Sequence, residues 1–232
     1  MQKSTTTKIK FCGLTRPEDI EIVNELKPDY VGFVFWPKSK RFVTGQQVLE
    51  LKRNLLPDIK AVGVFVDEDP ETVAALLVDG VIDIAQLHGS EDEEYIERLR
   101  KLIKNGKIGT DEDRFDNIPD GVNGIDTSQA IIIKAIVIKG EEDIERARSS
   151  SADFLLLDSG KGTGQTFNWE LIKNAELGKP YFLAGGLDPT NVAEAIKTLH
   201  PYAVDVSSGI ETNGIKDPEK MRQFESAARE MK

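Results

Sequence analysis

Short apolar runs alternate with longer amphipathic segments along almost the whole chain. Eight of the runs are rich in β-branched or aromatic residues and end in turn residues, which is typical of strands. They are KIKFCG (8–13), YVGFVFW (30–36), KAVGVFV (60–66), DIAQLHG (83–89), IIIKAIVIK (131–139), FLLLDS (154–159), YFLAGGL (181–187) and YAVDVSSG (202–209). Parallel strands need helical crossovers, and eight strands can close without a free edge. The pattern therefore predicts an α/β fold, a (β/α)8 TIM barrel that forms a single domain over residues 1–232.

Signals for helix starts follow most of these strands. Three segments have the spacing of a capping box: 15–18, 44–47 and 90–93. Three Asp–Pro pairs indicate an N-cap followed by proline in the first turn: 69–70, 188–189 and 217–218. In the predicted fourth helix, five apolar residues share one face: Tyr95, Ile96, Leu99, Leu102 and Ile103.

Two segments depart from the alternation. Residues 105–130 are rich in Gly, Asp and Asn, and loops this long are uncommon inside compact domains. We expect an insertion after the fourth helix, on the face away from the chemistry, with an extra strand near 107–109 as an open alternative. Residues 1–7 are polar and lack the apolar stretch of a signal peptide, so we expect a short loose tail.

Charge and cysteine content narrow the possible partners. The chain has 30 basic and 40 acidic residues, a net charge of -10, which repels nucleic acid and anionic membranes. We therefore expect neither as a partner. One cysteine cannot form an internal disulfide, which favours a reducing cytoplasm. No apolar run approaches the ~20 residues that cross a membrane.

Polar residues at the ends of the predicted strands are the candidates for chemistry, because barrels form their active sites there. Cys12 ends the first strand, His88 the fourth and Asp158 the sixth. Strand side chains alternate, so we expect Cys12 to point inward with Lys10. A thiolate and a protonated carboxyl group, Cys12 and Asp158, could then act as general base and general acid. A buried structural cysteine is the competing interpretation.

The loops after the seventh and eighth strands predict a phosphate site. Their small residues, in AGGLDPTNV and VDVSSGIE, let backbone N–H groups approach an anion, and barrels often bind phosphate there. Simple turn chemistry is the alternative. Gly164 in the GKGTG loop beside Asp158 is a further candidate for clamping a phosphorylated ligand.

Four other residues are candidates for binding or support. Arg41 follows the second strand and can grip a carboxylate with its fork of donors. Lys10 and Lys134 lie within strands, so one or both could point into the barrel and pair with Asp205 or another carboxylate. His88 could contact a ligand or cap the next helix.

Seven motifs together resemble the phosphoribosylanthranilate isomerase family of tryptophan biosynthesis. They are KIKFCGLTRPEDI, VGFVFWPKSKRFV, VGVFVDEDPE, QLHG, LLLDSGKGTGQTFNW, LAGGLDPTNV and VDVSSGIE, in the family's order. The resemblance implies a (β/α)8 barrel and an Amadori rearrangement without a cofactor. The substrate would be N-(5-phosphoribosyl)anthranilate and the product 1-(2-carboxyphenylamino)-1-deoxyribulose 5-phosphate.

The resemblance also implies roles for individual residues. Cys12 would be the general base, Asp158 the general acid and Arg41 the partner of the anthranilate carboxylate. The phosphate would lie against the last strand ends, at Gly185, Gly186, Ser208 and Gly209. We add Asp205 and His88 as substrate-binding candidates. No metal is implied, and the chain would be a monomer or a homodimer.

Two departures from the family and three alternatives complete the prediction. The family often has FDW where this chain has FNW (167–169), and residues 105–130 exceed the usual length.

A sugar-phosphate epimerase usually needs metal-binding histidines, and this chain has only His88 and His200. An aldolase-type lyase needs a lysine at a strand end, and Lys134 is within a strand. A binding module without chemistry would have no need of both Cys12 and Asp158.

Overall fold

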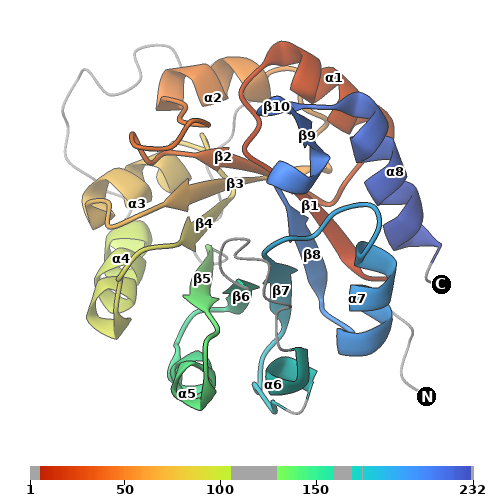
Figure 1. The fold of residues 1–232 in the computed structure, drawn as a ribbon. Coiled ribbons are helices and arrows are strands. Elements are labelled where there is room, and N and C mark those ends of the chain that lie inside the picture. Colours follow the sequence, from red (N-terminus) through yellow and green to blue (C-terminus); the bar gives the residue numbers. More distant parts are fainter. Residues whose placement is uncertain (1–5, 106–129, 159–168, 174, 231–232) are drawn as a thin grey trace.

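Eight parallel strands close into a barrel in sequence order, and helices surround it (Figure 1). The computed structural model describes residues 6–105, 130–158, 169–173 and 175–230. The strands are β1 (Lys8–Cys12), β2 (Tyr30–Val34), β3 (Lys60–Phe65), β4 (Ile84–Leu87), β5 (Ile131–Val137), β6 (Phe154–Asp158), β7 (Tyr181–Ala184) and β8 (Ala203–Val206). The helices between and after them are α1 (Pro17–Leu26), α2 (Gly45–Lys52), α3 (Pro70–Val78), α4 (Glu93–Asn105), α5 (Glu141–Ser149), α6 (Trp169–Lys173), α7 (Val192–Leu199) and α8 (Pro218–Arg229). The predicted TIM barrel is confirmed.

Strand residues alternate between an outer and an inner layer. Ile9 and Phe11 pack outward with helix residues, and the Phe11 ring meets that of Phe224 on α8 with centroids 6.1 Å apart. The inner layer consists of strand residues alone, Leu156 and Phe182 among them. Since Lys10 lies between two outward residues, it points into the barrel, and Cys12 follows on the same inner face.

Aromatic rings fill the barrel near the amino ends of its strands. Phe182 meets Tyr30 with ring centroids 5.3 Å apart and Phe154 at 5.8 Å, both edge-on. Tyr202 packs against Phe154 at 4.9 Å, and its hydroxyl lies 2.9 Å from that of Tyr30. This packing makes one end of the barrel apolar and leaves polar side chains to the carboxyl ends of the strands.

Half of the predicted helix starts form as expected. Thr44 and Gln47 make a reciprocal capping box at α2, and Asp69 and Asp217 accept backbone N–H groups at the starts of α3 and α8. The pair at 188–189 begins a turn instead, and α7 starts later, at Val192.

Two predicted capping boxes are wrong, because nearby carboxylates take the backbone donors. At α1, Asp19 accepts from the N–H groups of Thr15 and Arg16. Before α4, Ser90 bonds Asp67, and Asp92 accepts from Tyr95 N–H instead.

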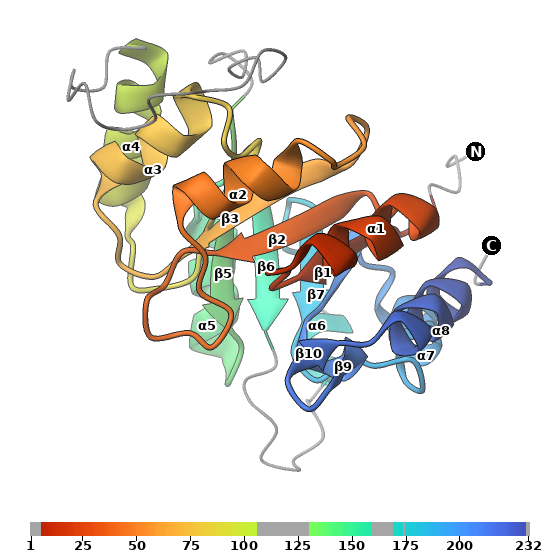
Figure 2. The same cartoon turned by 90° about the horizontal axis from the view of Figure 1, so that it is seen from above.

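A two-stranded hairpin after β8 was not predicted. It consists of β9 (Glu211–Thr212) and β10 (Ile215–Lys216), preceded by a 3-10 turn, η2 (Ser208–Ile210). Asn213 and Gly214 both have positive φ, 54° and 80°, as a two-residue hairpin turn requires. Figure 2 shows the hairpin at the end of the barrel toward which the arrowheads of β5 and β6 point.

Several predictions fall on residues outside the described part of the chain. These are most of the insertion (106–129), most of the tail (1–5), Gly164, and Asn168 of the FNW motif. The single-domain boundaries and the insertion therefore stay predictions. Within the described ranges, no helix is long and apolar enough to cross a membrane.

Candidate active site

Cys12 and Asp158 are each the last residue of a barrel strand, and both occupy positions that face the inside of the barrel. Cys12 ends β1 and is paired in register with Gly32 of β2. Asp158 ends β6, beside Ala184 of β7, and follows the outward-packed Leu157. Both side chains therefore lie at the carboxyl end of the barrel, with β7 and β8 between them on one side. Cys12 is 8% exposed, and the Asp158 side chain is 22% exposed.

A buried ion pair lies directly below Cys12 inside the barrel. Lys10 Nζ contacts Asp205 Oδ2 at 3.1 Å and donates to Gln86 Oε1 at 2.8 Å. The Lys10 side chain is fully buried, and Asp205 Oδ1 is buried with no hydrogen-bond partner among the described residues. Burial alone would lower the pKa of Lys10, but the Asp205 carboxylate, together with Cys12 when it is ionised, raises it above its ordinary value.

The protonation of Cys12 is a balance of opposing effects. Burial raises the pKa of the thiol, because the low dielectric disfavours the thiolate. The ammonium groups of Lys10 and Lys216 act against this, and the Asp205 carboxylate adds to it. The net pKa is raised, so the thiolate is the minor form in the free protein. A thiolate that forms under these conditions is a stronger base.

A second group of charges lies beside Cys12, between Arg41 and the hairpin. Arg41 makes a two-pronged ion pair with Glu211, with Nε at 2.7 Å from Oε1 and an Nη atom at 2.6 Å from Oε2. Glu211 also accepts from Lys216 Nζ at 2.6 Å, and that ammonium donates to Ser207 O at 2.9 Å. Burial alone would raise the pKa of Glu211, but Arg41 and Lys216 together lower it.

Gly13 explains how Arg41 comes so close to the Cys12 backbone. A Cβ atom added at Gly13 would lie 2.3 Å from Arg41 Cδ and 3.2 Å from Ser207 Oγ. Gly13 also has a φ of 80°, which other residues rarely adopt. Glycine is thus required here for the arginine to reach the barrel mouth.

The His88 ring contacts Asp158 through one nitrogen and Gln86 through the other. Its Nε2 is 3.5 Å from Asp158 Oδ2, and its Nδ1 is 3.1 Å from Gln86 Nε2. It does not cap α4, because Asp92 accepts the backbone N–H of Tyr95 there. The capping alternative for His88 is therefore wrong.

The loops after β7 and β8 pack closely together. A Cβ atom at Gly209 would lie 2.0 Å from the carbonyl oxygen of Leu187, so only glycine fits. Gly185 and Gly186 have φ values of 91° and 68°. Ser208 begins the short η2 turn, whose first N–H groups can face an anion.

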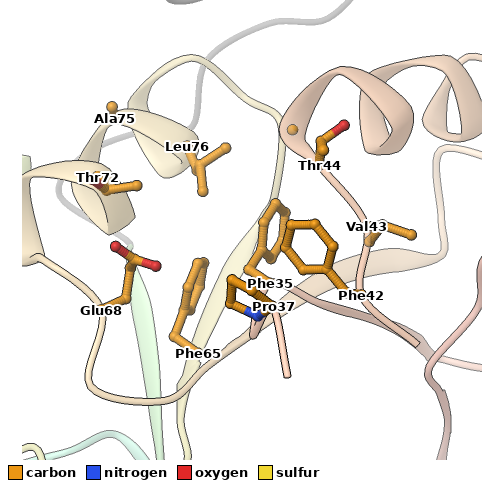
Figure 3. A pocket seen from close by; sticks show the side chains of 11 residues that line it. Phe35, Pro37, Phe42, Val43, Thr44, Phe65, Glu68, Thr72, Ala75 and Leu76 are labelled. Carbon is orange, nitrogen blue, oxygen red and sulfur yellow. The ribbon is translucent and has the colours of Figure 1, made fainter. Parts of the chain in front are cut away.

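An apolar cavity lies apart from these polar groups, between α2 and α3. It has a volume of about 350 Å³ (Figure 3). The rings of Phe35 and Phe65 stack in its wall with centroids 5.0 Å apart, and Phe42 stands beside them. None of the residues that line it is a candidate for the chemistry, so we assign the site to the barrel mouth rather than to this cavity.

The family model of N-(5'phosphoribosyl)anthranilate (PRA) isomerase matches residues 9–123 and 118–227. A relative from Thermoanaerobacter sp., named N-(5'-phosphoribosyl)anthranilate isomerase, is 43% identical over 222 residues, covering 94% of this chain and 95% of its own. This chain belongs to the PRA isomerase family.

Solved structures of the PRA isomerase family agree with the barrel. One, of monomers made from the dimeric enzyme of Thermotoga maritima, has a TM-score of 0.75 and 32% identity and covers 97% of this chain and 99% of its own. Another contains reduced 1-(o-carboxyphenylamino)-1-deoxyribulose 5-phosphate, with a TM-score of 0.74, 32% identity and the same coverage.

The prediction that the two strand lysines pair with carboxylates is confirmed, but only Lys10 points into the barrel. Lys134 lies on the outer face of β5, with Ile132 and Ile136. Lys10 pairs with Asp205 and Lys134 with Glu91, at 2.8 Å between Nζ and Oε2. Lys134 also donates to the carbonyl oxygen of Gly89. His200 ends α7 beside the start of β8, at the other end of the barrel from His88. Among the described residues, no group of three or more His, Cys, Asp or Glu side chains could hold a metal ion.

Three residues of the site were not predicted from the sequence: Gln86, Glu211 and Lys216. Gln86 and Glu211 stand within the quoted motifs, but nothing in those motifs shows which charges they meet. Lys216 had a usable signal, because Asn213–Gly214 between extended residues predicts a hairpin that folds back on its own start.

Proposed function

We propose that the protein converts N-(5-phosphoribosyl)anthranilate into 1-(2-carboxyphenylamino)-1-deoxyribulose 5-phosphate in tryptophan biosynthesis, with Cys12 as base and Asp158 as acid. Family membership makes the chain an isomerase of this kind. One observation supports the residue roles most: Cys12 and Asp158 end inward-facing strands at the same end of the barrel.

The chemistry needs one proton donor and one proton acceptor. Asp158 protonates the ribose ring oxygen as the C1–O bond breaks, and the substrate nitrogen supplies the electron pair that forms an iminium ion. The positive charge acidifies the C2 proton, which the Cys12 thiolate removes. The resulting enolamine becomes the ketone by tautomerisation. No cofactor is needed, because the substrate nitrogen is itself the electron sink.

Four features of the site support binding of such a substrate. Glu211 uses only one edge of the Arg41 guanidinium, so the other edge can take the anthranilate carboxylate. Asp205 Oδ1, without a partner, can accept a ribose hydroxyl. His88 stands beside Asp158 at the mouth. The small residues after β7 and β8 can hold the phosphate: Gly185, Gly186, Ser208 and Gly209. Gly164, the other residue predicted to bind the phosphate, lies outside the described residues.

Partners and location follow from the same proposal. The partner is a phosphorylated small molecule, with no nucleic acid and no membrane surface, consistent with the net charge of -10. We place the enzyme in the cytoplasm as a monomer or homodimer. A Thermotoga maritima relative is described as dimeric.

Turnover tests the proposal directly. Purified protein should consume N-(5-phosphoribosyl)anthranilate in the presence of a metal chelator and without any nucleotide, because every proposed step uses protein side chains and the substrate. The signal is the fluorescence of the aminobenzoate group, and the product is identified by reduction of its ketone, because substrate and product are isomers of equal mass. The gene should also restore growth without tryptophan to a strain that lacks this isomerase. A folded protein that binds the substrate but leaves it unchanged would instead be a binding module.

Replacing Arg41 with lysine should weaken substrate binding. Lysine keeps the charge but loses the fork that holds Glu211 on one edge and the substrate on the other. Loss of a charge-assisted bidentate contact corresponds to a rise in KM of roughly 10–100-fold, with a smaller change in kcat. Steady-state kinetics measure both.

Arg222→Lys is the matched control for this substitution. Arg222 makes the same two-pronged contact with Glu25, at 3.0 and 2.9 Å, on the outer surface of α8. Its kinetics should equal those of the unchanged enzyme. If Arg41→Lys also leaves KM unchanged, the carboxylate is held elsewhere.

A further inference from the structure

A continuous chain of polar contacts crosses the barrel between the two proposed catalytic residues. It begins at Lys10, below Cys12, and passes through Gln86 of β4 to His88 and Asp158. The steps are 2.8 Å from Lys10 Nζ to Gln86 Oε1, 3.1 Å from Gln86 Nε2 to His88 Nδ1, and 3.5 Å from His88 Nε2 to Asp158 Oδ2. Gln86 is 1% exposed, so water does not compete for its amide.

Lys10, the first residue in this series of contacts, determines which group donates in each of the following hydrogen bonds. An ammonium group only donates hydrogen bonds, so the amide oxygen of Gln86 must face Lys10. The amide NH2 group then faces His88, where it can only donate. His88 Nδ1 must accept that bond through its lone pair, and a neutral ring in that state carries its proton on Nε2.

We infer that Gln86 is a positioning residue. Its amide oxygen accepts from Lys10, so its NH2 group donates to His88 Nδ1 and holds the ring as the Nε2–H tautomer, which donates to Asp158. This inference rests on the proposed role of Asp158 as the acid. It assigns no contact with substrate to Gln86.

The tautomer matters because Asp158 must keep a proton until the ribose ring opens. A ring with a bare Nε2 would be a stronger base than a carboxylate, and it would take that proton from Asp158. The Nε2–H form has no lone pair to offer there. It can instead donate to the carboxylate that remains after Asp158 has given its proton to the ribose oxygen.

Nitrogen NMR reads the tautomer without any turnover. The chain has only two histidines, so histidine labelled with 15N gives two rings, and His200→Asn identifies them. Asparagine suits the left-handed backbone of His200, with a φ of 45°. In the unchanged enzyme, we expect His88 Nδ1 to resonate as an unprotonated nitrogen and Nε2 as a protonated one. A protonated Nδ1, or an even mixture of tautomers, overturns the inference.

Gln86→Glu reverses the hydrogen bond between residue 86 and His88 with almost no change in side-chain shape. The new carboxylate accepts from Lys10 and also from the ring, so His88 Nδ1 should become protonated. We expect kcat to fall ~10-fold or more, with KM within about threefold, because the acid is affected and binding is not. Gln46→Glu on the exposed face of α2 adds the same charge and should change nothing. An unchanged His88 spectrum, or full activity with a reversed tautomer, overturns the inference.

The NMR and kinetic results together distinguish failure of this inference from failure of the proposed function. If Gln86→Glu does not fold, Gln86→Met removes the donor without a charge, and both tautomers should then appear. If the unchanged enzyme shows the Nε2–H tautomer but no isomerisation, the proposed function fails and the positioning of His88 stands. If it isomerises the substrate with the other tautomer, only the positioning role fails.

Discussion

Cys12→Ala should leave a folded protein whose kcat is lower by ~10²–10⁴-fold, because the C2 proton then has no base to accept it. Cys12 belongs to neither of the two buried apolar clusters, and loss of one sulfur atom should cost about 1 kcal/mol of stability. Thermal unfolding should shift by only ~2–4 °C. The measurement is steady-state turnover of phosphoribosylanthranilate, with circular dichroism as the check on folding.

Cys12→Ser is the matched control for the loss of the thiolate. Its hydroxyl group has nearly the size of the thiol and can accept the same hydrogen bonds, but it does not ionise near neutral pH. We expect Cys12→Ser to be as slow as Cys12→Ala, which would show that ionisation, not shape, is what the reaction needs. Turnover near the level of the unchanged enzyme in either variant would remove Cys12 from the mechanism.

The fold was predictable because each unit of the barrel carries its own local signal. Every strand found in the barrel lies within one of the eight predicted runs, and the alternation that places Ile9 and Phe11 outward also places Lys10 and Cys12 inward. Helix starts were less certain. A backbone N–H donates to whichever carboxylate lies nearest, so the N–H groups of Thr15 and Arg16 donate to Asp19 at the start of α1.

The ends of strands identified the candidate residues, but not the charges around them. Periodicity puts Cys12 and Asp158 at one end of the barrel, whereas the ion-pair partner of Arg41, Glu211, comes from a hairpin 170 residues later in the chain. The pKa of Cys12 shows the same limit. The sequence predicts a thiolate as the base, but burial outweighs the charges of Lys10 and Lys216 and raises the pKa of the thiol, a balance that depends on three-dimensional packing.

Asp158→Asn should lower kcat by ~10²–10⁴-fold and leave KM within about threefold, because an amide cannot protonate the ribose oxygen but fills the same space. His88 Nε2–H can still donate to the amide oxygen, so the ring need not move. Asp153→Asn is the matched control, since Asp153 lies near the start of β6, away from the mouth. Equal turnover in Asp158→Asn and the unchanged enzyme would end the acid role.

The pH dependence of Asp158→Asn separates loss of the acid from any other damage. The reactive form needs an ionised Cys12, whose pKa is raised by burial, together with a protonated carboxyl group, which ordinarily ionises at lower pH. Between the two ionisations, the thiolate grows ~10-fold per pH unit while the protonated acid shrinks by the same factor, so kcat/KM of the unchanged enzyme should be flat. Asparagine removes the second factor. The residual kcat/KM of Asp158→Asn should therefore rise ~10-fold per pH unit through neutral pH, until the thiol is ionised. A flat profile in this variant would mean that Asp158 is not the group whose proton balances that of Cys12.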